Sequence, residues 1–325
     1  MRSLDVRSVV QRIQARDVRA IARAITLIEN QHPEATLLLE ALHPLTGRAM
    51  TVGVTGPPGA GKSSLVDHLI ASAREAQRTV AVIAVDPASP FSGGAILGDR
   101  IRMASHAGDT DVYVRSMSAR GHLGGLAIAT DGAAMVLDVA GFDVIIVETV
   151  GVGQSEIEVV ELADTTILVQ PPGLGDGVQA VKAGIMEVPA VFVVNKGDLP
   201  GAKQTAHDIR QALELGEPTP DGWTTPVLIT RSHASQETGV PALWETIQQH
   251  RDYLDNGLGL RQQRTRRIAR IITQLAQNRF NQALALALDS PEGRAMQDAM
   301  FTGRLGPWSA ADALVHSVIQ NLAKP

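Results

Sequence analysis

The stretch Gly56-Pro57-Pro58-Gly59-Ala60-Gly61-Lys62-Ser63 fits the pattern G-x-x-x-x-G-K-[ST] of a phosphate-binding loop. It stands between a β-rich run, Met50 to Val54, and a helical segment that begins at Ser64. In such a loop the glycines let backbone N–H groups converge on phosphate oxygens, and the next helix adds positive potential at its N-terminus. A purely structural glycine-rich turn is the alternative, and the flanking strand and helix disfavour it. The stretch therefore predicts a nucleotide-binding α/β fold.

Two side chains of this loop have specific predicted roles. Lys62 is expected to reach the β- and γ-phosphates and to act in catalysis, and Ser63 is expected to ligate Mg²⁺. Contacts to the nucleotide are predicted for Gly56, Pro57, Gly59, Ala60, Gly61, Lys62, Ser63 and Ser64.

Around this loop, short β-rich runs alternate with segments of helix length. The predicted strands are 50–54, 79–85, 111–114, 142–147, 165–169, 191–194 and 227–229. Runs that are apolar on both faces and separated by helices are typical of a mostly parallel sheet covered by helices on both sides. The predicted fold class is an α/β P-loop NTPase with helical extensions at both ends.

Both ends of the chain are predicted to be helical. Val18, Ile21, Ile25 and Ile28 fall on one helix face, and Asp17 is suited to cap that helix. After Gly239 the pattern changes to helices only. The predicted domains are an N-terminal helical extension at 1–48, a nucleotide-binding domain at 49–250 and a C-terminal helical region at 251–325.

The C-terminal region contains a long predicted helix that starts near Leu260 and a last helix from about Ser309. An apolar stripe on the long helix consists of Ile268, Ile271, Ile272, Leu275 and Ala276. A basic cluster on the same helix consists of Arg261, Arg264, Arg266, Arg267 and Arg270. The cluster is interpreted as a solvated helix face, with a docking surface for an acidic partner as the alternative.

The composition limits the classes of protein. The chain has 325 residues, 44% of them hydrophobic, and a formal net charge of -5. Proteins whose main partner is nucleic acid normally carry a basic excess, so that class is disfavoured. Without cysteine, the chain has no disulfide, thiolate metal site or cysteine nucleophile. The sequence shows neither a secretory signal nor a membrane-spanning run, so the expected location is the cytoplasm.

The base of the nucleotide is predicted from a second motif. Asn195, Lys196 and Asp198 form N-K-x-D after a buried-strand pattern. The Asp carboxylate can accept hydrogen bonds from guanine N1–H and its exocyclic amine, which adenine cannot offer, so the motif favours GTP. After the next strand, Ser232 and Ala234 are further candidates for nucleotide contact, whereas His233 is equally well interpreted as a surface residue.

Carboxylates at the ends of other strands are candidates for Mg²⁺ and for the attacking water. Glu148 ends a predicted strand, and Gly151 offers the backbone N–H that a γ-phosphate sensor requires. Asp86 ends another strand and Asp99 lies in a glycine-rich stretch, so both are candidate metal ligands, directly or through water. Asp99 and Glu148 are also candidate catalytic residues. A turn acid at Asp86 and a solvated loop at Asp99 are the alternatives.

A further mobile segment is predicted from Gly173 to Lys182, because glycines follow two stiff prolines there. The predicted switch residues are Gly173, Asp176, Gln179 and Lys182. Lys182 is either a surface lysine or a group that pairs with an acid beside the nucleotide in one state.

Taken together, these motifs resemble the MeaB/ArgK family of GTPases. The resemblance rests on G-P-P-G-A-G-K-S at 56–63, V-D-P-A-S-P-F-S-G-G-A-I-L-G-D-R-I-R-M at 85–103, F-D-V-I-I-V-E-T-V-G-V-G-Q-S-E at 142–156 and N-K-G-D at 195–198. It implies a homodimeric GTPase, paired through its C-terminal helices, that chaperones an adenosylcobalamin-dependent acyl-CoA mutase of the methylmalonyl-CoA mutase type. Such a chaperone gates cofactor loading and protects the mutase from inactivation.

The resemblance also implies residue roles. It assigns Lys62, Ser63, Asp86, Asp99 and Glu148 to the phosphates and Mg²⁺, and Asn195, Lys196 and Asp198 to guanine. Family members usually have an acidic residue where this chain has Gly177, and Ser-Ala where it has His233-Ala234. The first departure concerns the switch segment and the second concerns the loop that contacts the base.

Two rival classes share the nucleotide-binding core. A metallochaperone GTPase of the nickel-insertion type needs Cys or His clusters, and this chain has no cysteine and no close pair of histidines. A nucleotide-dependent kinase is the other class, and the N-K-x-D motif argues against it.

Overall fold

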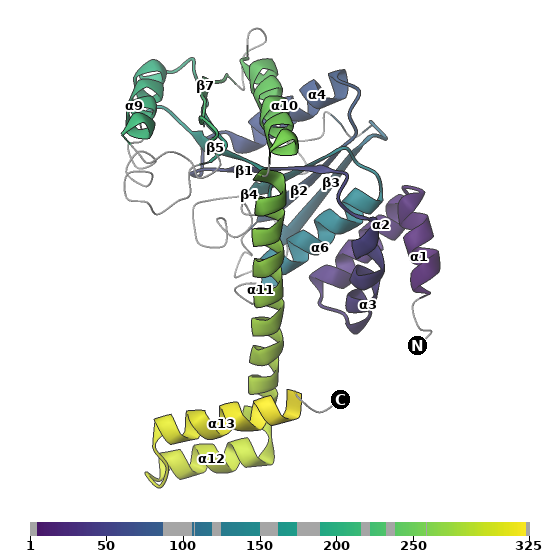
Figure 1. Ribbon diagram of the computed structural model, residues 1–325, viewed down its shortest axis with the longest axis vertical. Helices are drawn as coiled ribbons and strands as arrows, with labels where there is room; N and C mark the ends of the chain where they lie inside the picture. Colours follow the sequence, from purple (N-terminus) through teal and green to yellow (C-terminus); the bar gives the residue numbers. More distant parts are fainter. Residues whose placement is uncertain are drawn as a thin grey trace. The chain divides into compact units, whose positions relative to one another are not determined.

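The computed structural model describes residues 5–86, 106, 108–118, 125–149, 162–173, 189–215, 222–231, 238–257 and 259–322. The chain divides into two compact units, Met1–Arg267 and Ile268–Pro325. Element labels follow Figure 1. Among the described residues, no helix is long and apolar enough to cross a membrane. The predicted domain limits at 48/49 and 250/251 remain a prediction.

The first unit is built on a seven-stranded parallel sheet, as predicted (Figure 1). Its strands are β1 (Met50–Thr55), β2 (Val80–Asp86), β3 (Val112–Ser118), β4 (Val144–Thr149), β5 (Thr165–Gln170), β6 (Val191–Val194) and β7 (Val227–Ile229). Their order in the sheet is β3-β2-β4-β1-β5-β6-β7, so β1 lies at the centre. Each predicted strand is confirmed: the inner strands are apolar and buried on both faces, whereas the edge strands β3 and β7 are partly buried.

Helices cover both faces of the sheet (Figure 1). On one face, α4 (Lys62–Glu75) and α10 (Val240–Asn256) bury their apolar sides against β1 and its neighbours. On the other, α6 (Gly125–Val139) packs on β2 and β4, and α9 (Ala202–Glu214) packs on β5 and β6. The sheet is thus buried on both sides, which holds the strand ends in fixed positions.

The N-terminal helices belong to this core. They are α1 (Val6–Gln14), α2 (Val18–Glu29) and α3 (Pro33–Leu42), and they share one hydrophobic cluster with α6, β2 and β4. The side chains of Ile21 and Ile25 are at most 1% exposed. Asp17 caps α2 as predicted, since its carboxylate accepts from Arg19 N at 2.9 Å. Val18, the first residue of the helix, is 62% exposed, so the buried part of this face begins after it.

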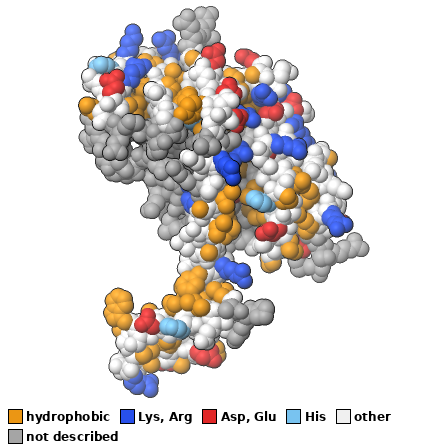
Figure 2. All heavy atoms as spheres, viewed as in Figure 1, with side chains coloured by type: hydrophobic (Ala, Val, Ile, Leu, Met, Phe, Trp, Pro, Cys, Tyr) orange, Lys and Arg blue, Asp and Glu red, His pale blue; other side chains and the backbone are white. Residues whose placement is uncertain are grey.

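Three helices follow the sheet domain: α11 (Gly259–Asp289), α12 (Pro291–Phe301) and α13 (Pro307–Leu322). The prediction had the starts of α11 and α13 nearly right but missed α12. In the second unit very few side chains are buried, and apolar side chains gather on the visible face of its helices (Figure 2).

Part of the basic cluster on α11 is not a solvated face, which corrects the sequence interpretation. The Arg267 guanidinium donates to the carboxylate of Asp131, a residue of α6 that is only 3% exposed. One turn earlier, Arg264 Nε lies 3.8 Å from Asp164 Oδ1. These pairs hold the first turns of α11 on the sheet domain.

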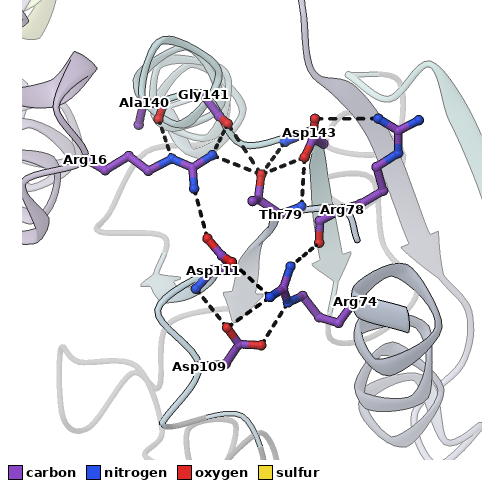
Figure 3. Close-up of polar contacts among 9 residues, drawn as sticks. All are labelled: Arg16, Arg74, Arg78, Thr79, Asp109, Asp111, Ala140, Gly141 and Asp143. Carbon is purple, nitrogen blue, oxygen red and sulfur yellow. Dashed lines mark hydrogen bonds and ion pairs between the residues drawn. The ribbon is translucent and has the colours of Figure 1, made fainter. Parts of the chain in front are cut away.

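Arg16 joins the N-terminal helices to the amino ends of the strands (Figure 3). Its Nε donates to Ala140 O at 3.0 Å, and one NH₂ group donates to Thr79 Oγ1 at 3.1 Å and to Gly141 O. The guanidinium carbon also lies 5.0 Å from the centre of the Phe142 ring. Arg16 therefore ties the turn between α1 and α2 to the ends of α6 and the starts of two strands.

A second arginine, Arg74 at the end of α4, completes this network (Figure 3). Its Nε donates to Asp109 Oδ2 at 2.8 Å, and an NH₂ group donates to Asp111 Oδ2 at 2.9 Å. The hydrogen bonds from Arg74 hold the pKa of Asp109 below its ordinary value. Asp111 accepts from both Arg16 and Arg74, so it links the two arginines.

Candidate functional site

The phosphate loop lies at the carboxyl end of β1, between the ends of β4 and β5. Two of its glycines are required by close contacts. A Cβ on Gly56, whose φ is +145°, would lie 2.0 Å from Val169 O. A Cβ on Gly61, whose φ is +87°, would lie 2.5 Å from Asn195 Nδ2. The loop path therefore excludes side chains at both positions.

The loop leads directly into α4, which begins at Lys62. Gly61 is the N-cap and supplies no side-chain acceptor, so no side chain of the cap occupies the first N–H groups of the helix. Lys62 is 6% exposed, and its Nζ donates to Gly56 O at 2.7 Å and to Pro57 O at 3.1 Å. The ammonium group thus lies across the start of the loop, beside the N-terminus of α4, which favours an anion.

Ser63 and Glu148 meet at the same edge of the sheet. Ser63 Oγ donates to Glu148 Oε1 at 2.6 Å, and the two residues are 7% and 1% exposed. Glu148 stands opposite Val54 in the register of β4 and β1, which brings its carboxylate beside the first turn of α4. A hydroxyl and a carboxylate are oxygen ligands of the kind that Mg²⁺ prefers, so this pair fits the predicted metal site.

The structure does not describe the side chains of the other two predicted metal ligands. Asp86 is the last residue of β2, paired in register with Ser118, and its side chain lies outside the described residues. Asp99 lies entirely outside them. Within the part of the chain that the structure describes, no group of three or more His, Asp or Glu side chains could hold a metal ion.

The N-K-x-D loop is attached to the phosphate loop by Asn195. This fully buried side chain donates from Nδ2 to Ala60 O at 2.9 Å, and its Oδ1 accepts from Thr230 Oγ1 at 3.0 Å. Lys196 has a φ of +56°, and Gly197 N donates to Thr230 O at 2.8 Å. The predicted guanine and phosphate motifs are therefore joined into one site by an asparagine.

Asp198, the last residue of the motif, is exposed. Its carboxylate is therefore accessible to a base that arrives from solvent. Thr230 is the residue that sequence reasoning missed. It is the first residue after β7. A polar residue directly after a buried strand is the sequence feature that could have identified it. The motif alone did not reveal that it accepts from Gly197 and donates to Asn195.

Of the predicted switch residues, the structure describes Gly173. Its φ is +83°, and its N–H donates to Thr205 Oγ1 of α9 at 3.2 Å. The remaining candidates for switch, sensor and base contacts lie outside the described residues: Gly151, Asp176, Gln179, Lys182, Ser232 and Ala234, together with the departures at Gly177 and His233.

Comparison with known proteins agrees with this geometry. The family described as "Methylmalonyl Co-A mutase-associated GTPase MeaB" matches residues 21–289. The chain belongs to the MeaB family. A Pyrococcus abyssi relative is 45% identical over 312 residues, which cover 95% of this chain and 96% of that protein. The Escherichia coli protein named "GTPase ArgK" is 39% identical over 246 residues, 73% of each chain.

More distant relatives extend the MeaB family match. The mouse protein "Methylmalonic aciduria type A homolog, mitochondrial" is 32% identical over 316 residues, 91% of this chain and 75% of that protein. A crystal structure titled "LAO/AO transport system kinase" superposes with a TM-score of 0.71 at 26% identity, covering 98% of this chain and 99% of the other. Both the motifs and the fold are therefore those of MeaB-family GTPases.

Proposed function

We propose that the protein is a GTP-binding and GTP-hydrolysing chaperone that assembles in the cytoplasm with an adenosylcobalamin-dependent acyl-CoA mutase of the methylmalonyl-CoA mutase type. It gates the loading of the cofactor and protects the mutase from inactivation. Nucleotide binding is supported by two hydrogen bonds that join the motifs: Ser63 donates to Glu148, and Asn195 donates to the phosphate loop. The mutase part is supported by membership of the MeaB family.

In this proposal each described side chain has one task. Lys62 turns from the carbonyls of Gly56 and Pro57 toward the β- and γ-phosphates, exchanging two neutral acceptors for charged ones. Ser63 and Glu148 hold Mg²⁺, which when bound neutralises charge on the phosphate oxygens. Asp198 selects guanine, and Asn195 fixes the distance between the base and the phosphates.

We further propose that hydrolysis is slow until the mutase is bound. Glu148 orients the attacking water or a water on the metal, and Asp99 completes the catalytic set. Gly151 senses the γ-phosphate, and Asp86 is a further metal ligand. The segment from Gly173 to Lys182 then carries the nucleotide state to the mutase.

The protein is also proposed to be a homodimer, paired through its C-terminal helices. A surface apolar patch larger than a few hundred Å² is typical of an interaction site. The second unit exposes eleven large apolar side chains: Ile268, Ile272, Leu275, Leu286, Leu288, Met300, Phe301, Trp308, Val315, Ile319 and Leu322. At roughly 100 Å² each, they offer about 1,000 Å² per copy, whereas a stable interface buries about 800 Å² per partner.

The test is a pull-down of cobalamin mutases by the tagged full chain, with a non-hydrolysable GTP analogue, with GDP and without nucleotide. We expect capture of a mutase that changes with the nucleotide, and we expect Lys62→Ala to remove that dependence. If none of a panel of cobalamin mutases associates in any nucleotide state, the chaperone role is wrong, while GTP binding measured on the same sample still tests the nucleotide site.

A further inference from the structure

Three buried polar side chains lie at the carboxyl ends of three neighbouring strands, β4, β1 and β5 (Figure 1). They are Thr149, Thr55 and Gln170, and they are 1%, 4% and 5% exposed. Side chains two residues apart on a strand point to the same face, and Val147 and Leu168 belong to the clusters that α6 and α9 cover. Thr149 and Gln170 therefore lie on that face, opposite to the face that packs against α4.

The two threonines of this row are joined to each other. Val54 stands opposite Glu148 in the register of β1 and β4, so the residues that follow them lie side by side. The Thr149 hydroxyl donates to Thr55 Oγ1 at 3.1 Å. Two hydroxyls carry two protons, and the bond between them uses one. The Thr55 hydroxyl therefore retains a proton that it can donate farther along the row.

Gln170 ends the row with an acceptor that lacks a donor. Within the part of the chain that the structure describes, its buried side-chain Oε1 has no hydrogen-bond partner. An unpaired buried acceptor is costly and rare in folded proteins. The backbone of the same residue is engaged, since Gln170 O accepts from Asn195 N at 2.9 Å. A donor on Thr55 and an acceptor on Gln170 thus occupy one face of adjacent strands.

These two groups lie within reach of each other. Thr55 stands opposite Leu168 in the register of β1 and β5, and Gln170 lies two residues farther along β5. With strands about 4.8 Å apart and a rise of about 3.3 Å per residue, the Cα atoms of Thr55 and Gln170 are separated by about 8 Å. A glutamine side chain spans most of this distance, so a small movement or one bridging water completes the bond.

Each member of the row adjoins a loop of the proposed nucleotide site. The phosphate loop begins directly after Thr55, and the proposed metal ligand Glu148 directly precedes Thr149. Gln170 is the last residue of β5, shortly before the predicted switch segment. The row is therefore open at the strand whose following loop is predicted to change with the nucleotide.

We propose that GTP binding completes the row, so that the Thr55 hydroxyl donates to Gln170 Oε1, directly or through one water, while it still accepts from Thr149. Gln170 is then a positioning residue, which touches no phosphate and couples the loop after β5 to the phosphate loop. Part of the binding free energy of GTP comes from pairing this acceptor. The proposal deepens the regulation of the GTPase site proposed above and rests on that site.

A double-mutant cycle on the full-length protein measures this bond. Titration calorimetry with a non-hydrolysable GTP analogue compares the native chain, Thr55→Val, Gln170→Met and the double variant. We expect each single variant to weaken binding about three- to tenfold. The double variant should bind about as well as the weaker single variant, because both substitutions remove the same bond. Thr55→Ser keeps the hydroxyl and should bind as the native chain does.

Thr165→Val is the matched control on the same strand. Thr165 is fully buried at the opposite end of β5, where its Oγ1 lies 2.9 Å from His250 Nδ1. We expect this substitution to lower the melting temperature, to leave GTP affinity unchanged and to combine additively with Gln170→Met. Without nucleotide, Gln170→Met should melt at or above the native temperature, because the substitution removes an unpaired acceptor. A merely structural glutamine would show a lower melting temperature instead.

Two results overturn the proposal: unchanged GTP affinity in Gln170→Met, and additive effects of Gln170→Met and Thr55→Val on that affinity. If Thr55→Val does not fold, Thr55→Ala takes its place in the cycle. When the native chain binds GTP and either result is found, the GTPase site stands and the coupling through Gln170 is wrong. A native chain that binds no GTP overturns the proposed function together with this inference.

Discussion

Polar side chains at the two ends of the strands serve different purposes. At the carboxyl ends, hydrogen bonds of Ser63, Glu148 and Asn195 hold together the loops of the proposed nucleotide site. At the amino ends, Arg16 and Arg74 bond carbonyls and carboxylates of the chain itself (Figure 3). The first end is arranged for a ligand and the second for the fold. Substitutions at one end should therefore change binding, and those at the other should change stability.

Lys62→Ala is expected to show the largest difference between an effect on GTP binding and an effect on stability. Charge-assisted bonds to phosphate contribute about 1.5–3 kcal/mol each, so losing them should weaken GTP binding by at least about 100-fold. The melting temperature without nucleotide should change little. Titration calorimetry and thermal unfolding measure the two effects. Lys203→Ala, an exposed lysine of α9, is the control and should leave both unchanged. Unaltered GTP affinity in Lys62→Ala would remove the phosphate site from this loop.

Arg16→Ala should give the reverse result. Arg16 donates hydrogen bonds to four acceptors and lies over the Phe142 ring, so its loss should lower the free energy of unfolding by about 3 kcal/mol. GTP affinity should change less than threefold. The control Arg12→Ala removes a 51% exposed arginine paired with Asp17 and should cost below about 1 kcal/mol. Equal losses in the two variants, in urea unfolding, would contradict the structural role of Arg16.

Two threonines at opposite ends of the sheet allow a matched comparison. Thr230→Val removes the bond from Oγ1 to Asn195 Oδ1 and should weaken GTP binding about fivefold, equivalent to about 1 kcal/mol. Thr225→Val removes a bond of similar length, 3.0 Å, to Pro189 O, and should reduce stability without changing GTP binding. Both variants are compared in the same calorimetric series. The comparison fails if Thr225→Val affects GTP as strongly as Thr230→Val.

The smallest expected effect is a pH dependence of stability, which arises from Arg74 and Asp109 at the amino ends of the strands. Hydrogen bonds from Arg74 lower the pKa of Asp109 from its ordinary value of 3.8. A lowered pKa in the folded state stabilises the protein above that ordinary value, and the contribution is lost as the pH falls below it. The stability difference between the native chain and Arg74→Ala should therefore stay constant from about pH 7 to 5 and shrink between about pH 4 and 3. Urea unfolding at each pH measures it; a difference that grows with acid has the wrong sign.

The sequence predicted all seven strands because the inner ones are buried on both faces and leave a continuous apolar pattern, although β3, with Arg115 and Ser116, extends beyond its predicted end. The phosphate loop and N-K-x-D were equally visible, since each is a short local pattern. The contacts of the N-terminal helices with the sheet could not be predicted from the sequence. Arg16 contacts residues 63 to 125 positions away, and no local pattern reveals such partners. The pairing of Arg267 with the buried Asp131, 136 positions away, was hidden for the same reason.

The prediction of helix faces also had a specific limit. An apolar stripe indicates that a helix face is buried, but it does not say against what. Ile268, Ile272 and Leu275 belong to the five-residue stripe predicted on α11, and each is about half exposed. Helical periodicity therefore identified an apolar face, and the structure shows that this face is only partly covered within the chain.

Guanine selection by Asp198 tests the central claim most directly. Xanthine carries an oxygen where guanine carries its exocyclic amine, so an amide in place of the carboxylate can donate to it. Titration calorimetry of the native chain and Asp198→Asn with non-hydrolysable GTP and XTP should show a strong preference for GTP in the first and for XTP in the second. Equal GTP affinity in both proteins would contradict a guanine site formed by this loop.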